Sequence, residues 1–478
     1  MSLANATTSP GDAEPEPGEP ATTADEASLP LGVLILVGAL FFGVFRQGAY
    51  HAWQLEIFSY AAFGAGALLL LSQRRMTLVS AAVITAPLFA SAALSTALSS
   101  DTSDARSTFL VIGLVAIGLA AGFAVPPQRR PLAIDAVVLV ALVVAATAIW
   151  GVAHHQPKWG RITEGVWRGS SSLTYANAAA SLLGPIVLLL LRRLVDRPSI
   201  VLTMAATFCT IGFASTQSRG GALAVVAVGI VLLLRTGFGA IARVGLPIAA
   251  GTAVGAPALL AFAPTTEQAR PFLVLTLVAT GLAISAGLAL NADRIPRPGR
   301  ILAGLAVIAI VVAATTGLAE PLTDRLTLRS STTAGGPTEQ VRFGDRGREW
   351  KAGWDQFVAA PVAGNGPGVV NLRWTQDGRS YRANFVHNEY LEFAVTNGAL
   401  GLAALLASAS LFAWRTRRVT GHVVSGSRSG PPDRWVAGAV AFAVGAFALH
   451  SAFDFLWHLP ALPVLFAFLA GVATSRPT

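Results

Sequence analysis

Long apolar runs alternate with short polar segments along most of this chain. The runs recur from Leu31 to Ala473, and each reaches the length of about 18 residues or more that a bilayer-spanning helix needs. The residue-by-residue alternation of a membrane β-barrel is nearly absent, so helices are the way to satisfy the backbone within each span. The pattern therefore predicts an all-α, polytopic transmembrane helical bundle of about 12–14 spans. The candidate spans are 30–45, 54–71, 77–97, 107–125, 132–152, 173–191, 199–215, 220–235, 244–263, 271–290, 301–318, 384–414, 435–452 and 460–474.

Polar segments of unequal length divide these spans into groups. The first is an acidic tail rich in Pro and Ala without Lys or Arg, a composition typical of disorder, and it lacks the basic region of a signal peptide. The expected organisation is a disordered cytoplasmic tail at 1–28, N-terminal transmembrane helices at 29–153, an outer loop at 154–172, central transmembrane helices at 173–318, a large extracytoplasmic loop at 319–383 and C-terminal transmembrane helices at 384–478.

Charge decides how the spans are oriented. Only 12% of the residues are Asp, Glu, Lys or Arg, about half the share found in soluble domains. Arginines concentrate in alternate loops, and the positive-inside rule places these loops and both termini on the cytoplasmic side of the lipid bilayer. The net charge of +9 is therefore a matter of topology and does not indicate a nucleic-acid partner. The single cysteine, Cys209, lies in an apolar run and is expected to be a packing residue.

Two outer segments break the charge rule, because both 154–172 and 319–383 carry basic side chains that do not serve topology. Arginine is the preferred partner of phosphate, so the two segments together favour an anion site over a merely solvated cap. Within the second segment, the spacing of Trp350, Trp354 and Phe357 predicts one face of a helix. Such a helix suits the membrane interface or a lid, although packing onto the bundle is an equally simple explanation.

The stretch NFVHNEYLEF places His387, Asn388, Glu389 and Tyr390 at the outer start of the twelfth span. Acidic and polar residues are ordinary at a helix N-terminus. Histidine adds a possible base, because its unperturbed pKa near neutrality lets the imidazole take a proton from a hydroxyl.

Two arginines stand beside other spans. STQSRGG puts Arg219 at the outer junction of the seventh and eighth spans, where it could hold an anion or extend to lipid headgroups. Arg168 precedes the sixth span, whose first turns hold Tyr175 and Asn177. An asparagine in a membrane helix can also simply hydrogen-bond to a neighbouring helix.

The stretch HSAFDFLWHLPA spaces His450, Asp454 and His458 as i, i+4 and i+8, which predicts one helical face. Two histidines and a carboxylate could bind a metal, but a hydrogen-bonded network that supports the site is favoured. The chain contains no cysteine cluster, phosphate-binding P-loop, dinucleotide fingerprint or serine elbow.

In their order along the chain, SLTYANAAA, STQSRGGALA, REWKAGWDQFVAAPVAGNGPGVV, HNEYLEFAVTNGALGLAALL and HSAFDFLWHLPA resemble the O-antigen ligase / Wzy-type polymerase superfamily of bacterial membrane proteins. The resemblance covers residues 165–465, approximately. It implies a helical, GT-C-like glycosyltransferase that works on the outer face of the membrane without a cofactor or a metal. Such enzymes take a glycan from an undecaprenyl-pyrophosphate carrier and pass it to a hydroxyl of a glycan, lipid or protein acceptor.

The resemblance also implies roles for individual residues. His387 matches the histidine proposed as the base, and Arg219 matches the arginine that would hold the pyrophosphate. Arg168 stands where an arginine often precedes the helix that contains an asparagine, and the loop arginine of the superfamily is either Arg342 or Arg346. The remaining candidates for substrate contact are Asn177, Asn388 and Tyr390.

A different class of function is a transporter or flippase of an anionic lipid-linked sugar. That hypothesis predicts charged residues near the middle of several spans, and the sequence places almost none there. A peptidoglycan polymerase would share the broad class, but its characteristic motifs are not found in this chain.

Overall fold

The structure is a computed structural model that describes residues 28–72, 74–99, 101–295, 301, 343–376, 379–421 and 434–475. The predicted acidic tail, the predicted span at 301–318 and the first part of the large loop lie outside these residues, apart from Ser28 and Ile301.

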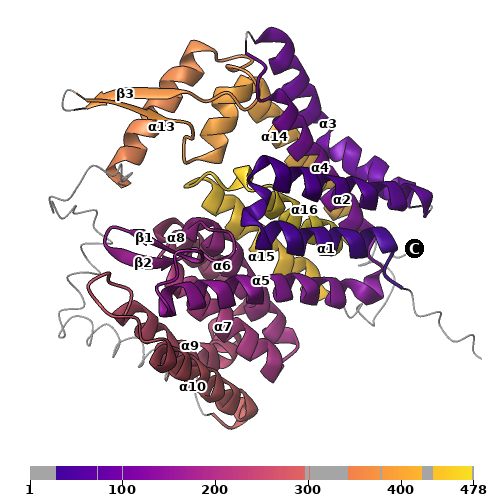
Figure 1. Ribbon diagram of the computed structural model, residues 1–478. Helices are drawn as coiled ribbons and strands as arrows, with labels where there is room; N and C mark the ends of the chain where they lie inside the picture. Colours follow the sequence, from indigo (N-terminus) through magenta and orange to yellow (C-terminus); the bar gives the residue numbers. More distant parts are fainter. Residues whose placement is uncertain are drawn as a thin grey trace, which may run out of the picture.

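Helices dominate the described part of the chain (Figure 1). Every predicted span other than 301–318 coincides with one of them. The helices are α1 (Leu31–Phe45), α2 (Ala52–Leu71), α3 (Arg75–Leu98), α4 (Ala105–Phe123), α5 (Arg130–Ala153), α6 (Ala176–Asp196), α7 (Ile200–Thr216), α8 (Arg219–Thr236), α9 (Phe238–Ala261), α10 (Pro271–Leu290), α13 (Phe343–Ala359), α14 (Glu389–Gly421), α15 (Arg434–Ser451) and α16 (Ala461–Ala473). Short 3₁₀ helices are η1 (Gln47–Ala49), η2 (Pro127–Arg129), η3 (Ala292–Arg294) and η4 (Leu456–His458).

Among the described helices, nine are long and apolar enough to cross a membrane, and α1, α7, α15 and α16 are shorter apolar helices. The predicted all-α polytopic membrane fold is thereby confirmed. Burial separates the helices into an inner and an outer set. In α6, 83% of the apolar window is buried, against 22% in α8 and in α10. A helix that is apolar on all sides and covered on all sides belongs at the centre, whereas the exposed apolar faces of α8 and α10 suit contact with lipid.

Small residues let α6 take that central position. Its first turns read ANAAAS, and all six side chains are buried. No hydrophobic effect drives helices together inside a bilayer, so their association depends on van der Waals contact, and small side chains allow the close approach that such contact needs. The N-terminus of α6 is therefore held firmly among its neighbours, and the polar groups around Asn177 are fixed with it.

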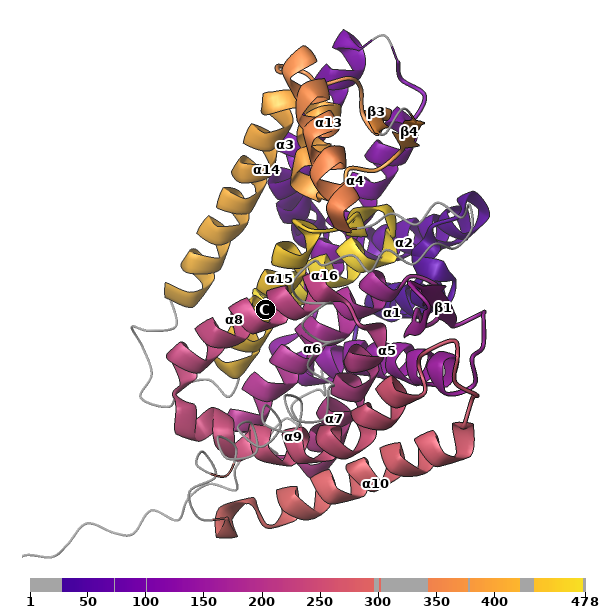
Figure 2. The same cartoon turned by 90° about the vertical axis from the view of Figure 1, so that its left-hand side faces the viewer.

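One end of the bundle collects the loops that were predicted to face outward. The loop at 154–175 forms an unpredicted antiparallel hairpin of β1 (Gly160–Thr163) and β2 (Val166–Gly169). An isolated bridge joins Val166 to Pro264, in the loop between α9 and α10, and Gln47 N donates to Ser172 O at 3.2 Å. We call this end the site end. It lies on the left in Figure 1 and faces the viewer in Figure 2.

The large loop contributes α13 and a second hairpin, β3 (Leu372–Gln376) with β4 (Arg379–Ala383), which lie beside α3 and α14 (Figures 1 and 2). The predicted helix is confirmed, but its aromatic face is not uniform. Trp350 and Phe357 pack in an apolar cluster with Val386, whereas Trp354 is 56% exposed. The interface or lid role of this helix stays a prediction.

The glycine-rich segment after α13 packs into a break in α14. Gly398 has φ +66°, and a Cβ there would lie 2.2 Å from Val362 O. The break frees two backbone N–H groups, and the segment satisfies both, because Ala399 N donates to Pro361 O at 2.8 Å and Leu400 N to Val362 O at 3.2 Å. This joint fixes α13 against α14, which is what positions the residues described next.

Candidate active site

Asp454 is the centre of a buried polar cluster at the site end. Its side chain is 1% exposed, and its carboxylate accepts hydrogen bonds from Tyr175 Oη at 2.6 Å and from Asn177 Nδ2. Arg346 NH2 lies 3.4 Å from Asp454 Oδ2, and Arg346 NH1 donates to Phe453 O at 2.7 Å. The carboxylate thus joins the start of α6 to α13.

The prediction that His450, Asp454 and His458 share one helical face is wrong. Helix α15 ends at Ser451, so Asp454 lies in the following turn and His458 in η4. A short 3₁₀ segment and Pro460 follow in place of a further helical turn. The three side chains therefore do not share one helical face. The expected hydrogen-bonded network is present for Asp454, which accepts from Tyr175 and Asn177, and for His458, which pairs with Glu392. It does not include His450 Nε2, which has no hydrogen-bond partner among the described residues.

Arg168 extends this cluster to the β1–β2 hairpin. Its Nε donates to Thr216 O at 2.8 Å and its NH2 to Asn177 Oδ1 at 2.9 Å. Burial lowers the pKa of Arg168 from its ordinary value, and the neighbouring Tyr175 opposes that shift. The structure therefore brings Arg168, Asn177 and Arg346 together around Asp454, while Arg342 lies outside the described residues.

Arg219 is the first residue of α8, in a tight turn at the site end. Gln217 takes a left-handed conformation at φ +50°, and Ser218 caps the helix by accepting from Gly221 N at 3.2 Å. The turn packs against α15, since a Cβ on Gly220 would lie 3.3 Å from His450 Nε2. The Arg219 side chain is 31% exposed, and its NH2 is 3.9 Å from Glu164 Oε2. The Arg219 side chain is thus more exposed than that of Arg346, which is 14% exposed.

His387 precedes α14 and does not open it, because the helix begins at Glu389. Its backbone is left-handed, with φ +52°, a conformation that costs a non-glycine residue of the order of 1 kcal/mol or more. Its ring lies edge-on to Phe455 at 4.9 Å, and Phe455 stacks on Tyr175 at 4.9 Å. One aromatic ring thus separates His387 from the cluster around Asp454.

Helix α13 holds His387 from the other side. Trp350 Nε1 donates to His387 O at 3.4 Å, and Glu349 Oε2 lies 2.9 Å from His387 Nδ1. Glu349 is fully buried and is the site residue that the sequence reasoning missed. A signal was present, because Arg346, Glu349 and Trp350 have the i, i+3, i+4 spacing of one helical face.

Asn388 and Tyr390 have structural partners. Asn388 Oδ1 caps α14 by accepting from Tyr390 N and Leu391 N, each at 3.1 Å. Tyr390 Oη donates to Ala448 O of α15 at 2.8 Å. Their predicted contact with substrate stays a prediction, while their polar atoms already hold the start of α14 in place.

One group of described residues has the composition of a metal site. The ligand atoms of Glu389, Glu392 and His458 lie within 4.8 Å of one another. These atoms already have protein partners: Trp457 N donates to Glu389, Val386 N donates to Glu392 at 2.9 Å, and His458 Nε2 pairs with Glu392. Burial opposes a charged His458 ring, but the carboxylates of Glu392 and Glu389 outweigh burial and raise its pKa to about 9. An ion pair is therefore the state that these contacts describe.

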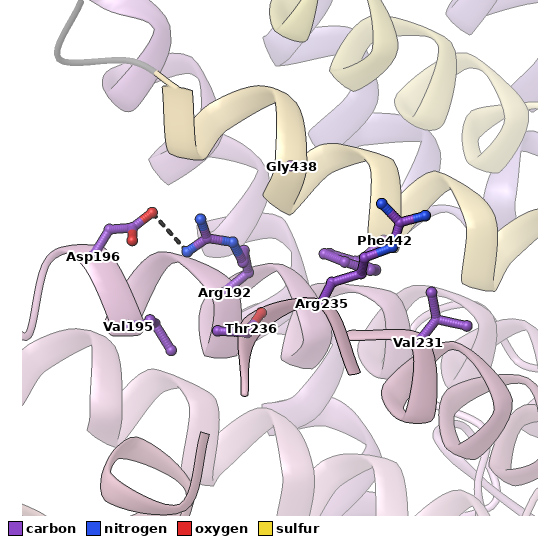
Figure 3. A pocket seen from close by; sticks show the side chains of 8 residues that line it. All are labelled: Arg192, Val195, Asp196, Val231, Arg235, Thr236, Gly438 and Phe442. Carbon is purple, nitrogen blue, oxygen red and sulfur yellow. Dashed lines mark ion pairs between the residues drawn. The ribbon is translucent and has the colours of Figure 1, made fainter. Parts of the chain in front are cut away.

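A cavity of about 670 Å³ lies at the opposite end of the bundle, where α6, α8 and α15 meet (Figure 3). Arg192 pairs with Asp196 there at 2.6 Å. Its lining contains none of the predicted site residues and consists of Arg192, Val195, Asp196, Val231, Arg235, Thr236, Gly438 and Phe442. The candidate active site is thus the buried cluster at the site end, not this cavity.

Fold and site together define a multi-pass helical membrane protein whose buried polar groups gather at one end. A family model described as O-antigen ligase matches residues 271–406, a stretch that includes Arg346, Glu349 and His387. The match confirms the resemblance to the O-antigen ligase / Wzy-type polymerase superfamily. The family indicates a membrane enzyme of the ligase or polymerase type. None of the curated proteins compared with the chain matches it.

Proposed function

We propose that the protein is an envelope polysaccharide polymerase or ligase. It transfers a glycan from an undecaprenyl-pyrophosphate carrier to an acceptor hydroxyl by a metal-independent, inverting reaction. The family match supports a lipid-linked glycan as the donor class. The observation that carries the proposal is that His387, the guanidinium groups of Arg168 and Arg346, and the Arg219 turn come together at one end of the bundle from four distant segments.

His387 acts as the general base. The acceptor oxygen attacks the anomeric carbon of the donor while its proton passes to the His387 imidazole, and the bond between that carbon and the phosphate oxygen breaks. The electron pair of this bond leaves with undecaprenyl pyrophosphate. Attack opposite the leaving group inverts the anomeric centre, and a base within hydrogen-bond reach of the hydroxyl contributes typically about 10²–10⁴-fold to such a step.

The arginines stabilise the pyrophosphate as its charge develops. Arg219 is the most exposed of the three, and Gly220 and Gly221 let its turn pack closely against the segment around His450. Arg168 and Arg346 are fixed by Asn177, Thr216, Phe453 and Asp454, so they need no reorganisation during the reaction. Fixed cationic groups in a site shielded from water stabilise a leaving anion far better than mobile ones.

The position of the cluster at the end of the bundle suits this chemistry. The prenyl tail of the donor stays in the bilayer, while its sugar and phosphate groups reach the polar residues of the site end at the bilayer surface. The protein therefore has only to orient the two glycans. The site end faces the outer side of the bacterial inner membrane in this proposal, with both termini in the cytoplasm, as the arginine distribution predicts.

The test uses the full chain in nanodiscs with a radiolabelled undecaprenyl-pyrophosphate glycan and an acceptor glycan. Wild type is compared with His387→Ala and Arg219→Ala, with and without a chelator. Transfer that is lost in both variants and unaffected by the chelator supports the proposal. Full transfer by His387→Ala, or loss of wild-type transfer on chelation, contradicts the assigned chemistry. Movement of the donor across the bilayer without product would support a flippase instead.

A further inference from the structure

The strongest unassigned feature of the molecule is the buried carboxylate of Glu349. Its exposed fraction is 0%. Within the described part of the chain, neither of its oxygens accepts a hydrogen bond of regular geometry. Among the described residues, His387 Nδ1 lies 2.9 Å from its Oε2. A buried carboxyl group whose oxygens accept no regular hydrogen bond costs free energy, so its presence is not explained by stability.

The surroundings of His387 point to a positioning role. The residue is held in a left-handed backbone conformation, its carbonyl accepts from Trp350 Nε1, and its ring edge meets Phe455. Trp350 and Glu349 are neighbours on α13, so one helix holds both the backbone and the ring of His387. The side chain is only 14% exposed. Because the backbone is strained and the side chain is mostly covered and held from two sides, the imidazole has little freedom to turn.

We propose that Glu349 is the positioning residue of the base. This inference rests on the proposed transfer reaction. The Glu349 carboxylate accepts the Nδ1–H of His387, which fixes the tautomer whose Nε2 carries the lone pair and turns Nε2 toward the acceptor. When Nε2 takes the acceptor proton, the ring becomes a cation and the fixed carboxylate stabilises it. The proton stays on Nε2 until the product leaves, and Glu349 itself is not protonated.

The contact between Glu349 and His387 is close but is not a regular hydrogen bond. The distance of 2.9 Å is within hydrogen-bond reach, while the approach is not aligned as a regular hydrogen bond. Catalytic hydrogen bonds are often misaligned without substrate and tighten in the reacting complex.

The kinetic test compares Glu349→Gln and Glu349→Asp with Asp355→Asn, a matched carboxylate-to-amide change on the exposed side of the same helix. All are full-length proteins in nanodiscs with the labelled donor. Glu349→Gln should lower kcat at least about tenfold, with the donor KM changed less than about threefold. Glu349→Asp should restore part of kcat, and Asp355→Asn should match wild type. Wild-type kcat in Glu349→Gln, or a raised KM with kcat unchanged, overturns the proposal.

A double variant separates positioning from folding. Placed on His387→Ala, the change Glu349→Gln should cause no further loss of residual transfer, because the carboxylate acts only through the imidazole. A further tenfold loss would show that Glu349 acts independently of His387 and overturns the proposal.

The tautomer can be read without activity, which keeps this inference distinguishable from the proposed function. Nitrogen-15 spectra of His387, assigned by subtraction of His387→Ala, should show a protonated Nδ1 and a free Nε2 in wild type. Glu349→Gln should lose that preference. A wild type that transfers no glycan but shows this signature contradicts the transferase proposal alone. A wild type that transfers glycan with Nε2 protonated contradicts the role of Glu349 alone.

Discussion

The Tyr175 hydroxyl donates a hydrogen bond of 2.6 Å to Asp454 Oδ1, although the two residues are 279 positions apart in the chain. Burial raises the pKa of Tyr175 well above its ordinary value, and the charge of Asp454 adds to the shift. The phenol therefore stays a donor at any physiological pH. The bond ties the start of α6 to the turn after α15 and keeps the polar cluster assembled.

Removal of the Asp454 carboxylate should be severe. In Asp454→Ala, Tyr175, Asn177 and Arg346 each lose one acceptor, and the Arg346 guanidinium loses its charged partner, a situation that costs about 3–5 kcal/mol. Tyr175→Phe loses two hydrogen bonds, the one donated to Asp454 and the one accepted from Asn177, and keeps the stack on Phe455, at a cost of about 1.5–3 kcal/mol. Thermal unfolding in detergent should rank the two variants in that order.

Asp355→Asn is the control for this series, because its exposed pair with Lys351 should contribute less than about 1 kcal/mol. An Asp454→Ala protein as stable as this control would contradict the role of Asp454 as the acceptor that holds the cluster.

The spans could be predicted from the sequence because each depends on a local property, the length of an apolar run. Arg168 and Asn177 could be singled out, because arginine and asparagine beside apolar runs are conspicuous, whereas Arg346 came only from the resemblance, as an alternative to Arg342. The contact of these residues with substrate stays a prediction. The partners were not found, because Asp454 joins them through contacts between segments far apart in the chain. Local spacing was even misleading for His450 and His458, since the helix ends at Ser451.

Glu349 was hidden for a related reason. A charged residue in an amphipathic helix of a polar loop is ordinarily solvated, and its neighbours Arg348 and Lys351 are indeed exposed. Only the packing of α13 against the start of α14 buries Glu349 under His387. The two hairpins escaped prediction because each strand has no more than five residues and lies among glycine and polar residues.

Tyr390→Phe distinguishes a structural from a substrate-binding role. The hydroxyl bonds to Ala448 O, so its loss should destabilise the protein by about 1 kcal/mol and leave kcat and KM within about twofold of wild type. Tyr60→Phe, at a tyrosine that is 73% exposed, is the matched control. A raised KM with unchanged stability would instead support direct contact between Tyr390 and the substrate.

Gly398→Ala tests the joint between α14 and the glycine-rich segment. The new Cβ would meet Val362 O at 2.2 Å, and φ +66° is strained for alanine. We expect a loss of about 2 kcal/mol or more in unfolding free energy, together with reduced transfer, because α13 depends on this joint. Gly64→Ala, which meets no atom within 4 Å inside α2, should be neutral or stabilising. Equal effects of the two changes would show that the joint does not position α13.

The pair of His458 and Glu392 gives stability a specific pH dependence. The carboxylates, with a smaller contribution from Asp104, raise the pKa of His458 from 6.5 to about 9 against the effect of burial. The ion pair therefore contributes fully below pH 6.5 and is lost as the pH rises through about 9. The unfolding temperature of wild type should fall over this interval more steeply than that of His458→Gln. Parallel curves for the two proteins would mean that His458 is not charged in the folded state.

Arg219 and Glu164 should have opposite effects on the donor. Arg219→Ala removes a cation that stabilises the leaving pyrophosphate and should lower kcat/KM about 10²–10³-fold. Glu164→Gln removes a carboxylate 3.9 Å from Arg219 that competes with the donor for the same guanidinium. Since Glu164 is half exposed, this competition is weak, and the donor KM should fall by at most about fivefold. Initial rates against donor concentration measure both effects. If Glu164→Gln instead raised the donor KM, Glu164 would be holding the Arg219 side chain in its productive position rather than competing with the donor for it. The hairpin of β1 and β2 would then belong to the binding site itself.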